Sequence, residues 1–367
     1  MIYLDHHAAS PLGASARAAL DEAREVAWAN PSSVHAAGRA ARSVVERARE
    51  RVAAAVGAAP ADLIFTAGGT EACNLGVLGL ADGVRAVLSS AIEHPAVAAA
   101  VDALGARVIR LEVPAGRPPA PAAFAAALEG VDLAAIQWVN HETGTVLPVA
   151  DYARACRAAG VPLFVDATQA LGKRPVDVGA LGATAVAFAS SKIGGPPAAG
   201  ALWIARDAPL TPRALGGAQE RGRRAGSPDP VALAGFGGAA SAVGDRLDAM
   251  PAVAARRDHL EAALVAAGAS VNGDAGPRVP TVTNVSVPGW RGPRLVAALD
   301  LESLCASSGA ACSSGLDEPS PVLAAMYPDA PWRAESALRL SLGPDTRDAD
   351  VAEARAILAR VLARKRQ

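Results

Sequence analysis

The sequence predicts an α/β protein with a large domain built on a mostly parallel sheet and a smaller α+β domain. Short apolar segments alternate with longer amphipathic segments through residues 39–204. The chain has 367 residues, of which 51% are hydrophobic, and this is enough to bury the cores of two domains. Beyond about residue 226 the alternation gives way to a long Ala-rich segment followed by shorter mixed elements.

Seven segments are expected to be strands, because each is a short apolar run between turn residues. They are Leu63–Thr66, Ala86–Leu88, Arg107–Leu111, Ala134–Val139, Leu163–Val165, Ala185–Phe188 and Gly200–Ile204. The helices expected among them are Arg39–Val56, Thr70–Leu80, Pro95–Leu104, Pro121–Leu128 and Val149–Ala159. Strands that alternate with helices form sheets covered on both faces. We therefore expect a large domain at residues 13–250 with a seven-stranded sheet.

The smaller domain is expected to comprise residues 251–367 together with residues 1–12. The elements predicted beyond residue 230 are a long Ala-rich helical region at Val231–Ala267, a strand at Thr283–Val287, a helix at Pro293–Leu299, a Ser/Gly-rich loop and a carboxy-terminal helix. We expect this domain to carry that loop toward the larger one.

Composition excludes several classes of partner. Lysine plus arginine (35) nearly balances aspartate plus glutamate (36), so no strong field attracts nucleic acid or a membrane surface. Apolar runs are shorter than the roughly 20 residues of a membrane span. The four cysteines are sparse, and the amino terminus lacks a signal-peptide pattern. These features predict a cytoplasmic protein that acts on a small neutral or zwitterionic substrate.

A carboxylate and an amine follow two of the expected strands. Asp166 ends the run Leu163–Asp166, and Lys192 follows Ala185–Ser191. A carboxylate can keep a pyridine nitrogen protonated, and a lysine can form a Schiff base with an aldehyde. The pair therefore suggests a pyridoxal 5'-phosphate (PLP) site, while the alternative is a structural Lys–Asp ion pair.

Two further features fit a phosphorylated flat ring. Gly69 and Thr70 lie between a strand and a helix, where backbone N–H groups favour an anion. His94 precedes a helix and can cover a ring and move protons. The alternatives are an ordinary capped turn and a helix-cap or core histidine. Three loop serines could add phosphate contacts or be ordinary loop residues: Ser190, Ser191 and Ser227.

A thiol and a guanidinium group complete the candidate chemistry. Cys312 lies among small residues of the Ser/Gly-rich loop, where an accessible thiol with an ordinary pKa is partly thiolate at neutral pH. The other cysteines, Cys73, Cys156 and Cys305, are expected to be packing residues. Arg339 interrupts an apolar run and suits a carboxylate, or else forms an internal salt bridge.

Taken in order, these motifs resemble the cysteine desulfurases (NifS- and IscS-like enzymes) of the class-V aminotransferase family. The resemblance runs nearly end to end through the segments 3–5, 30–35, 65–72, 93–97, 165–169, 216–222, 308–312 and 338–343. It implies the aspartate aminotransferase-like fold of PLP-dependent transferases.

The resemblance also implies a role for each matched residue. Lys192 would hold PLP as a Schiff base, with Asp166 at the pyridine nitrogen, Gln169 and His141 near the ring oxygen, and His94 stacked on the ring. The phosphate would be held by Gly69, Thr70, Ser190 and Ser191, and by Ser227 of a neighbouring subunit, which implies a homodimer. Asn30 and Arg339 would bind the substrate.

The implied reaction converts L-cysteine to L-alanine. Lys192 would move the α-proton, and Cys312 would take the sulfur as a persulfide. A sulfur-acceptor protein would receive it for iron–sulfur cluster assembly or thiolation. Two alternatives remain: another PLP reaction, such as that of a selenocysteine lyase, C–S lyase or aminotransferase, and a catalytically weakened scaffold protein.

Three segments depart from the usual pattern of the family. Ser191 stands where histidine usually precedes the lysine, and Ala189 where a serine is common. His141 replaces an asparagine near the ring oxygen. The paired His6 and His7 replace an Asn/Ala run and raise the alternative of a metal, but no cluster at ligand spacing accompanies them, so we expect no metal site.

Overall fold

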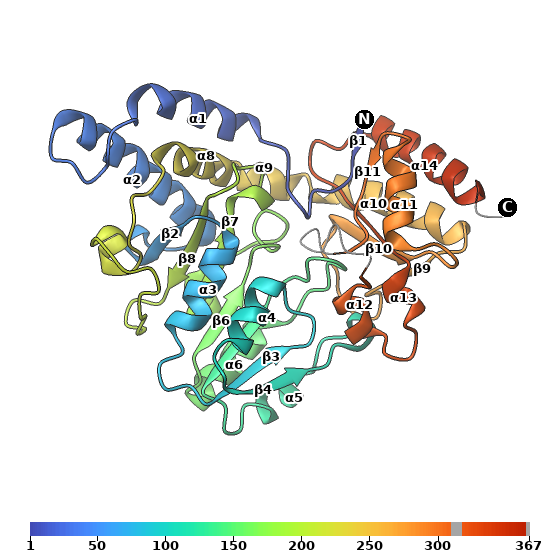
Figure 1. Ribbon diagram of the computed structural model, residues 1–367, viewed down its shortest axis with the longest axis horizontal. Coiled ribbons are helices and arrows are strands. Elements are labelled where there is room, and N and C mark those ends of the chain that lie inside the picture. Colours follow the sequence, from blue (N-terminus) through green and yellow to red (C-terminus); the bar gives the residue numbers. More distant parts are fainter. Residues whose placement is uncertain (310–317, 365–367) are drawn as a thin grey trace.

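The computed structural model describes residues 1–309 and 318–364. Its largest element is a seven-stranded sheet in the order β2-β8-β7-β6-β5-β3-β4 (Figure 1). Strand β8 is antiparallel to both neighbours, and the other pairs are parallel. The predicted α/β fold with a mostly parallel seven-stranded sheet is confirmed. The strands are β2 (Leu63–Thr66), β3 (Ala86–Ser90), β4 (Arg107–Leu111), β5 (Leu133–Gln137), β6 (Leu163–Asp166), β7 (Ala185–Ala189) and β8 (Gly200–Ile204).

Alternate residues of these strands face opposite apolar cores, as the two-residue period of a strand requires. One face packs on α3 (Gly69–Gly79) and α4 (Pro95–Asp102), and it includes Phe164 and Leu202. The other face includes Val165 and Phe188. It is covered by α2 (Ala36–Val56), α5 (Pro121–Ala126), α6 (Val149–Ala159), α7 (Val178–Leu181) and α8 (Pro230–Ser241). Helix α1 (Ala14–Val26) packs on α8.

A second apolar core lies around a three-stranded antiparallel sheet in the order β12-β10-β9. These strands are β12 (Ala337–Ser341), β10 (Val282–Ser286) and β9 (Ser270–Val271). Strand β1 (Ile2–Tyr3) pairs with β11 (Leu304–Cys305), so the amino terminus joins this region. The helices of this core are α10 (Met250–Ala266), α11 (Gly292–Asp300) and α14 (Asp348–Ala363). Helices α12 (Pro321–Met326) and α13 (Trp332–Glu335) contribute their buried residues to the larger core. The domain limits that we gave remain a prediction.

The helical region expected at Val231–Ala267 is helical in the structure and is divided into three helices. The segment forms α8, α9 (Val243–Asp248) and α10, with Ala242 and Ala249 between them. Helix α8 is buried between α1 and α2, whereas α10 packs on β10 and α14. The two helices therefore belong to different hydrophobic cores. Pro251 in the first turn of α10 lacks an N–H group and can begin a helix but cannot continue one. Among the described residues, no helix is both long and apolar enough to span a membrane.

Candidate active site

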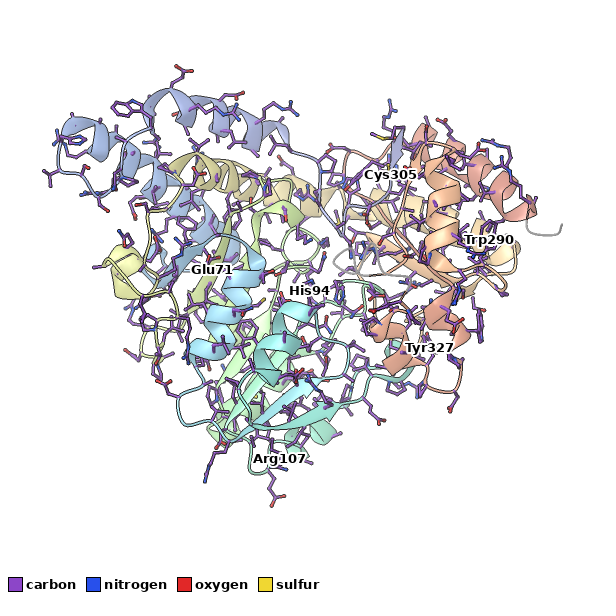
Figure 2. All side chains as sticks on the ribbon, in the orientation of Figure 1. Glu71, His94, Arg107, Trp290, Cys305 and Tyr327 are labelled. Atoms are coloured by element: carbon purple, nitrogen blue, oxygen red, sulfur yellow. The ribbon has the colours of Figure 1, made fainter. Side chains whose placement is uncertain are left out.

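A cavity of about 180 Å³ opens at the carboxyl ends of β6 and β7, beside the amino-terminal ends of α3 and α4. Figure 2 shows His94 in the middle of the molecule, between the large sheet and the orange-to-red elements around β10. Arg339 enters the cavity from β12 of the smaller sheet. The cavity collects the predicted residues Gly69, Thr70, His94, His141, Asp166, Gln169, Ser191, Lys192 and Arg339.

Three other predicted residues that the structure describes are not among those that line the cavity. The Ser190 hydroxyl is buried against Gly195, where an added Cβ would lie 2.0 Å from it. Ser227 lines a separate hollow with Phe65 and Arg224. Asn30 is exposed before α2, and its carboxamide oxygen accepts a hydrogen bond from the Ser32 backbone. Cys312 lies outside the described residues.

Asp166 and Lys192 are held in place by backbone contacts. Asp166 is the last residue of β6 and is 7% exposed, and its Oδ1 accepts a 2.9 Å hydrogen bond from the Thr168 backbone. Lys192 Nζ donates to the backbone carbonyl of Ala8. Because neighbouring parallel strands end at one edge of the sheet, the residues at and after the ends of β6 and β7 share one wall of the cavity.

The first turn of α3 offers a cradle for an anion. Gly68, just before the helix, has a φ of 146°, which favours glycine, and it provides no side-chain cap. A Cβ on Gly69 would lie 3.0 Å from the Ala189 side chain, so this position must stay small. The backbone N–H groups at the start of the helix are thus accessible to a phosphate group beside Thr70.

Two histidines meet over the cavity. His94 caps α4, and its Nδ1 accepts a 3.1 Å hydrogen bond from the Ala96 backbone, which leaves the ring hydrogen on Nε2. Burial lowers the pKa of His94; the Lys192 charge lowers it too, whereas Asp166 raises it. The His141 ring lies edge-on to the His94 ring, with centroids 4.9 Å apart. Neutral imidazoles at neutral pH can accept or relay protons.

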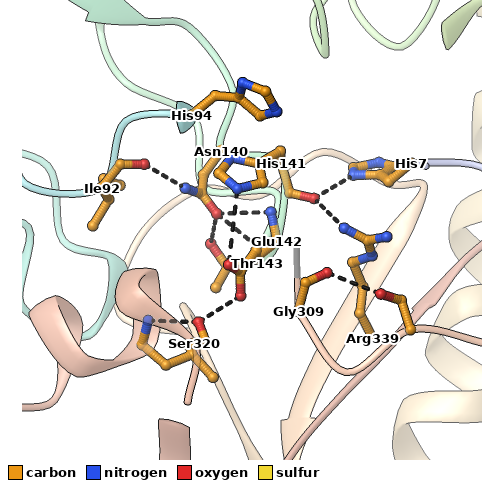
Figure 3. Close-up of polar contacts among 12 residues, drawn as sticks. His7, Ile92, His94, Asn140, His141, Glu142, Thr143, Gly309, Ser320 and Arg339 are labelled. Carbon is orange, nitrogen blue, oxygen red and sulfur yellow. Dashed lines mark hydrogen bonds and ion pairs between the residues drawn. The ribbon is translucent and has the colours of Figure 1, made fainter. Parts of the chain in front are cut away.

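Arg339 is held by neighbours on both sides. Its Nη1 donates to the His141 carbonyl at 3.1 Å (Figure 3). Its Nη2 donates to Asp5 Oδ1 at 2.7 Å. The internal salt bridge that was the alternative for this residue is therefore present. The Nε atom, by contrast, is buried and has no hydrogen-bond partner within the described residues. The guanidinium group thus keeps donor capacity for a carboxylate in the cavity.

The sequence interpretation missed Lys173 and the cavity role of His7. Lys173 is fully buried and donates to Gln169 Oε1, while Gln169 Nε2 donates to the His7 carbonyl at 2.9 Å. Burial lowers the pKa of Lys173 well below its usual value, and the charges of Lys192, Arg246 and Arg339 lower it further. Gln169 and Lys173 lie in a turn region between β6 and α7, so no helical or strand periodicity in the sequence indicated their contact. These contacts fix the orientation of the Gln169 amide.

His6 and His7 face different surroundings. His7 lines the cavity, donates from Nδ1 to the His141 carbonyl at 3.2 Å, and accepts from Thr281 Oγ1 at 2.9 Å. His6 packs against Gly343 and Tyr3. Burial lowers the pKa of His6 to about 4. No group of three or more His, Cys, Asp or Glu residues suited to a metal ion occurs in the described part of the chain.

The residues present fit a phosphorylated pyridine aldehyde. The cavity provides an amine for the aldehyde, a buried carboxylate for a ring nitrogen, and a helix start for the phosphate. The buried Arg339 Nε and His141 Nδ1 atoms have no hydrogen-bond partner within the described residues, and unsatisfied buried groups of this kind indicate a ligand.

Comparisons with known proteins agree with this geometry. The family model for class-V aminotransferases matches residues 2–353. The chain is 37% identical to an IscS-like cysteine desulfurase of Mycobacterium tuberculosis, over 100% of this chain and 98% of that protein. It is similar to the solved NifS-like protein from Rickettsia africae, with a TM-score of 0.90, 25% identity and 99% of both chains covered. It is also similar to SspA solved in complex with cysteine, with a TM-score of 0.79, 26% identity, and 94% and 99% covered.

Proposed function

Because the chain belongs to the class-V aminotransferase family over nearly its whole length, we propose from that premise that it is a PLP-dependent cysteine desulfurase. The observation that carries this function is one cavity lined by Lys192, Asp166 and Arg339. An amine, a buried carboxylate and a buried guanidinium group are what cofactor attachment, ring-nitrogen pairing and amino-acid recognition require.

Each cavity residue has a distinct task. Lys192 would hold the cofactor aldehyde, Asp166 would pair with the ring nitrogen, and the start of α3 with Gly69 and Thr70 would bind the phosphate. Arg339 orients the cysteine carboxylate with donors that Asp5 and the His141 carbonyl do not use. Bound pyridoxal phosphate supplies an electron sink that stabilises negative charge at the substrate α-carbon.

Protons at the α-carbon are moved by side chains at the wall. The Lys192 amine is placed to take the α-proton of cysteine, and His94 Nε2, at the same cavity, would donate or accept a proton. The buried Lys173–Gln169–His7 contacts fix the Gln169 amide at the cavity wall, where it would contact the ring oxygen of the bound cofactor. Fixed dipoles of this kind cost no reorganisation during the reaction.

The sulfur leaves as a persulfide on Cys312. Its thiol attacks the cysteine sulfur, the substrate carbon–sulfur bond breaks, and a sulfur–sulfur bond forms. L-Cysteine and one enzyme thiol thus give L-alanine and one enzyme persulfide, with no external oxidant or reductant. We propose that a sulfur-acceptor protein of the cytoplasm then takes the sulfur, for iron–sulfur cluster assembly or for thiolation.

A homodimer is part of this proposal. Ser227 lines a hollow separate from the cavity of its own chain, which is consistent with a contact to a neighbouring subunit's phosphate. We expect the Ser227→Ala variant to bind pyridoxal phosphate more weakly.

The attachment of the cofactor to Lys192 can be tested directly, because the chain has few lysines. The chain has three, Lys173, Lys192 and Lys365. Borohydride reduction of the cofactor-loaded protein, followed by peptide mass spectrometry, is expected to place the pyridoxyl group on Lys192. Labelling at Lys173, or at neither residue, would overturn the assignment. Alanine formation from L-cysteine is the matching activity measurement.

The thiol has a matched control within the chain. Cys312→Ser is expected to abolish persulfide formation while retaining the absorbance change on cysteine binding. Cys305→Ser is expected to retain both, because Cys305 lies beside β1, apart from His94 in Figure 2. Equal persulfide yield from the two variants would refute the role of Cys312.

A further inference from the structure

The imidazole of His141 has features of a ligand-facing base. It is 6% exposed and lines the cavity with Lys192 and Arg339. Its Nδ1 atom is buried and has no hydrogen-bond partner within the described residues. Its Nε2 atom lies 3.8 Å from Oε1 of Glu142 (Figure 3). One ring nitrogen is therefore left for a ligand, while the other faces a carboxyl group.

The Glu142 carboxyl group is fixed for this purpose. Glu142 is fully buried, and its Oε2 accepts a 2.6 Å hydrogen bond from Ser320 Oγ. Its backbone N–H donates to Asn140 Oδ1 at 3.0 Å, and its carbonyl accepts from Asn284 at 3.3 Å. A carboxyl group held within 4 Å favours the charged form of a neighbouring imidazole, even without a direct hydrogen bond.

The other groups that face His141 keep its ring neutral at rest. Burial lowers its pKa well below the usual value, and the charges of Arg339 and Lys192 lower it further, as does a proton on His94 when it is present. The ring is therefore ready to accept a proton. Asparagine, which the family resemblance led us to expect here, has no basic nitrogen and could not do so.

The position of Arg339 indicates which group would donate a proton to His141, namely the α-amino group of a bound amino acid. Arg339 Nη1 donates to the carbonyl of His141 itself, so a carboxylate bound by Arg339 lies next to this residue. The α-amino group of an amino acid is one carbon away from its carboxylate. It must lose a proton before it can attack the aldehyde held by Lys192, because an ammonium group has no lone pair.

We propose that His141 and Glu142 form an additional acid–base pair that deprotonates the ammonium group of incoming cysteine. The N–H bond of the ammonium group breaks, its electron pair stays on the substrate nitrogen, and the proton moves to His141 Nδ1. Glu142 stabilises the resulting imidazolium, and the proton returns to the amino group of alanine on release. This inference rests on the proposed function.

Side-chain substitution tests this role cleanly. The contacts from Arg339 and His7 reach the backbone carbonyl of His141, so they remain in a His141→Asn variant. We expect His141→Asn to lose roughly 10²-fold in kcat/KM at neutral pH, as for removal of a general base. The loss should shrink as the pH approaches the pKa of the cysteine amino group, because the substrate then arrives deprotonated. Glu142→Gln should show a smaller loss with the same pH dependence.

The control is His259→Asn, since His259 is an exposed histidine on α10. It is expected to leave the pH profile unchanged. If His141→Asn keeps the wild-type profile, or loses activity equally at every pH, the proposal is overturned. Should that variant fail to fold, Glu142→Gln gives the same decision.

A second readout does not depend on turnover. Nitrogen-15 NMR of histidine-labelled protein, at neutral pH and without cofactor, is expected to show the His141 hydrogen on Nε2 and a lone pair on Nδ1. A hydrogen on Nδ1 would overturn the proposal. If wild-type protein forms no alanine from cysteine, the proposed function fails, and with it the inference about cysteine. The NMR result then separately tests the His141–Glu142 geometry.

Discussion

Two arginines of this protein are buried to nearly the same extent but are used differently. Arg49, on α2, is 3% exposed, and Arg339, on β12, is 1% exposed. Arg49 Nη1 and Nη2 both bind the buried Glu220 carboxylate at 2.8 Å, and its Nε binds Glu46 at 3.1 Å. Burial opposes the charge of Arg49, but the contacts with Glu220 and Glu46 outweigh it and raise its pKa.

Arg339 has fewer contacts. One carboxylate, from the 18%-exposed side chain of Asp5, and one backbone carbonyl contact it, and its Nε has no partner within the described residues. A buried guanidinium group with unused donors is costly unless a ligand completes it. Hydrogen-bond satisfaction, more than burial, thus distinguishes Arg49, which stabilises the fold, from Arg339, which we propose binds the substrate.

The largest expected effect concerns Arg49, whose hydrogen-bond donors have partners, and it is a loss of stability. Arg49→Met would leave the Glu220 carboxylate buried without its cation. It would also loosen residues 220 and 221, whose φ values of 47° and 58° are unusual for non-glycine residues. We expect a loss of about 3 to 5 kcal/mol in the free energy of unfolding, measured by urea denaturation.

Two controls sharpen this expectation. Arg47→Met, on the same helix, removes an exposed ion pair with Glu22 and should cost less than about 1 kcal/mol. Adding Glu220→Gln to Arg49→Met should recover much of the loss, because no uncompensated charge then remains. Equal losses for the Arg47 and Arg49 variants would show that the buried Arg49–Glu220 pair stabilises the fold no more than an exposed ion pair does.

The second prediction concerns Glu93, a buried carboxyl group next to the cavity residue His94. Its Oε1 accepts from Ser90 and Gln137, whereas Oε2 has no partner within the described residues. Burial raises its pKa to about 8, and the charge of Asp166 adds to the shift. The folded state therefore keeps a proton that the unfolded chain loses above its ordinary carboxyl pKa.

Stability contributed by this proton is present at acidic pH and lost as the pH rises toward 8. Glu93→Gln should remove that component, because its amide stays neutral and still accepts from Gln137. Between pH 5 and pH 8, the free energy of unfolding of wild type is expected to fall by about 3 kcal/mol more than that of the variant, as measured by urea denaturation without cofactor. Glu50→Gln, on the exposed side of α2, should behave like wild type. Parallel pH curves for wild type and Glu93→Gln would contradict the shift.

Local sequence signals predicted the frame of the site. Val149–Ala159 is bounded as expected, because its apolar face is periodic and Gly160 ends it at a φ of 68°. Asp166, Lys192 and His94 were found because each stands where a strand has just ended, and polar residues there meet at one edge of the sheet.

Tertiary contacts decided what local signals did not. His7 enters the cavity because β1 pairs with β11 and the chain then crosses toward Gln169, which no nearby residue indicates. The breaks between α8 and α10 were not predicted, because they fall at alanines, and alanine has a high helix propensity at any position. The ion pair between Arg339 and Asp5 joins residues 334 positions apart, so no local pattern in the sequence could indicate it.

The smallest expected effect tests the unsatisfied arginine. Arg339→Lys keeps a charge near Asp5 but removes the planar fork and the Nε donor, so a bound carboxylate loses a charge-assisted contact worth about 1.5 to 3 kcal/mol. The KM for L-cysteine should rise by roughly 10- to 100-fold, with little change in the free energy of unfolding. Cysteamine, which lacks the carboxylate, is the matched probe: wild type should bind it far more weakly than cysteine, as judged by the cofactor absorbance change, and the variant should discriminate much less. A variant that still prefers cysteine as strongly as wild type would place Arg339 with Arg49, among the arginines that serve the fold.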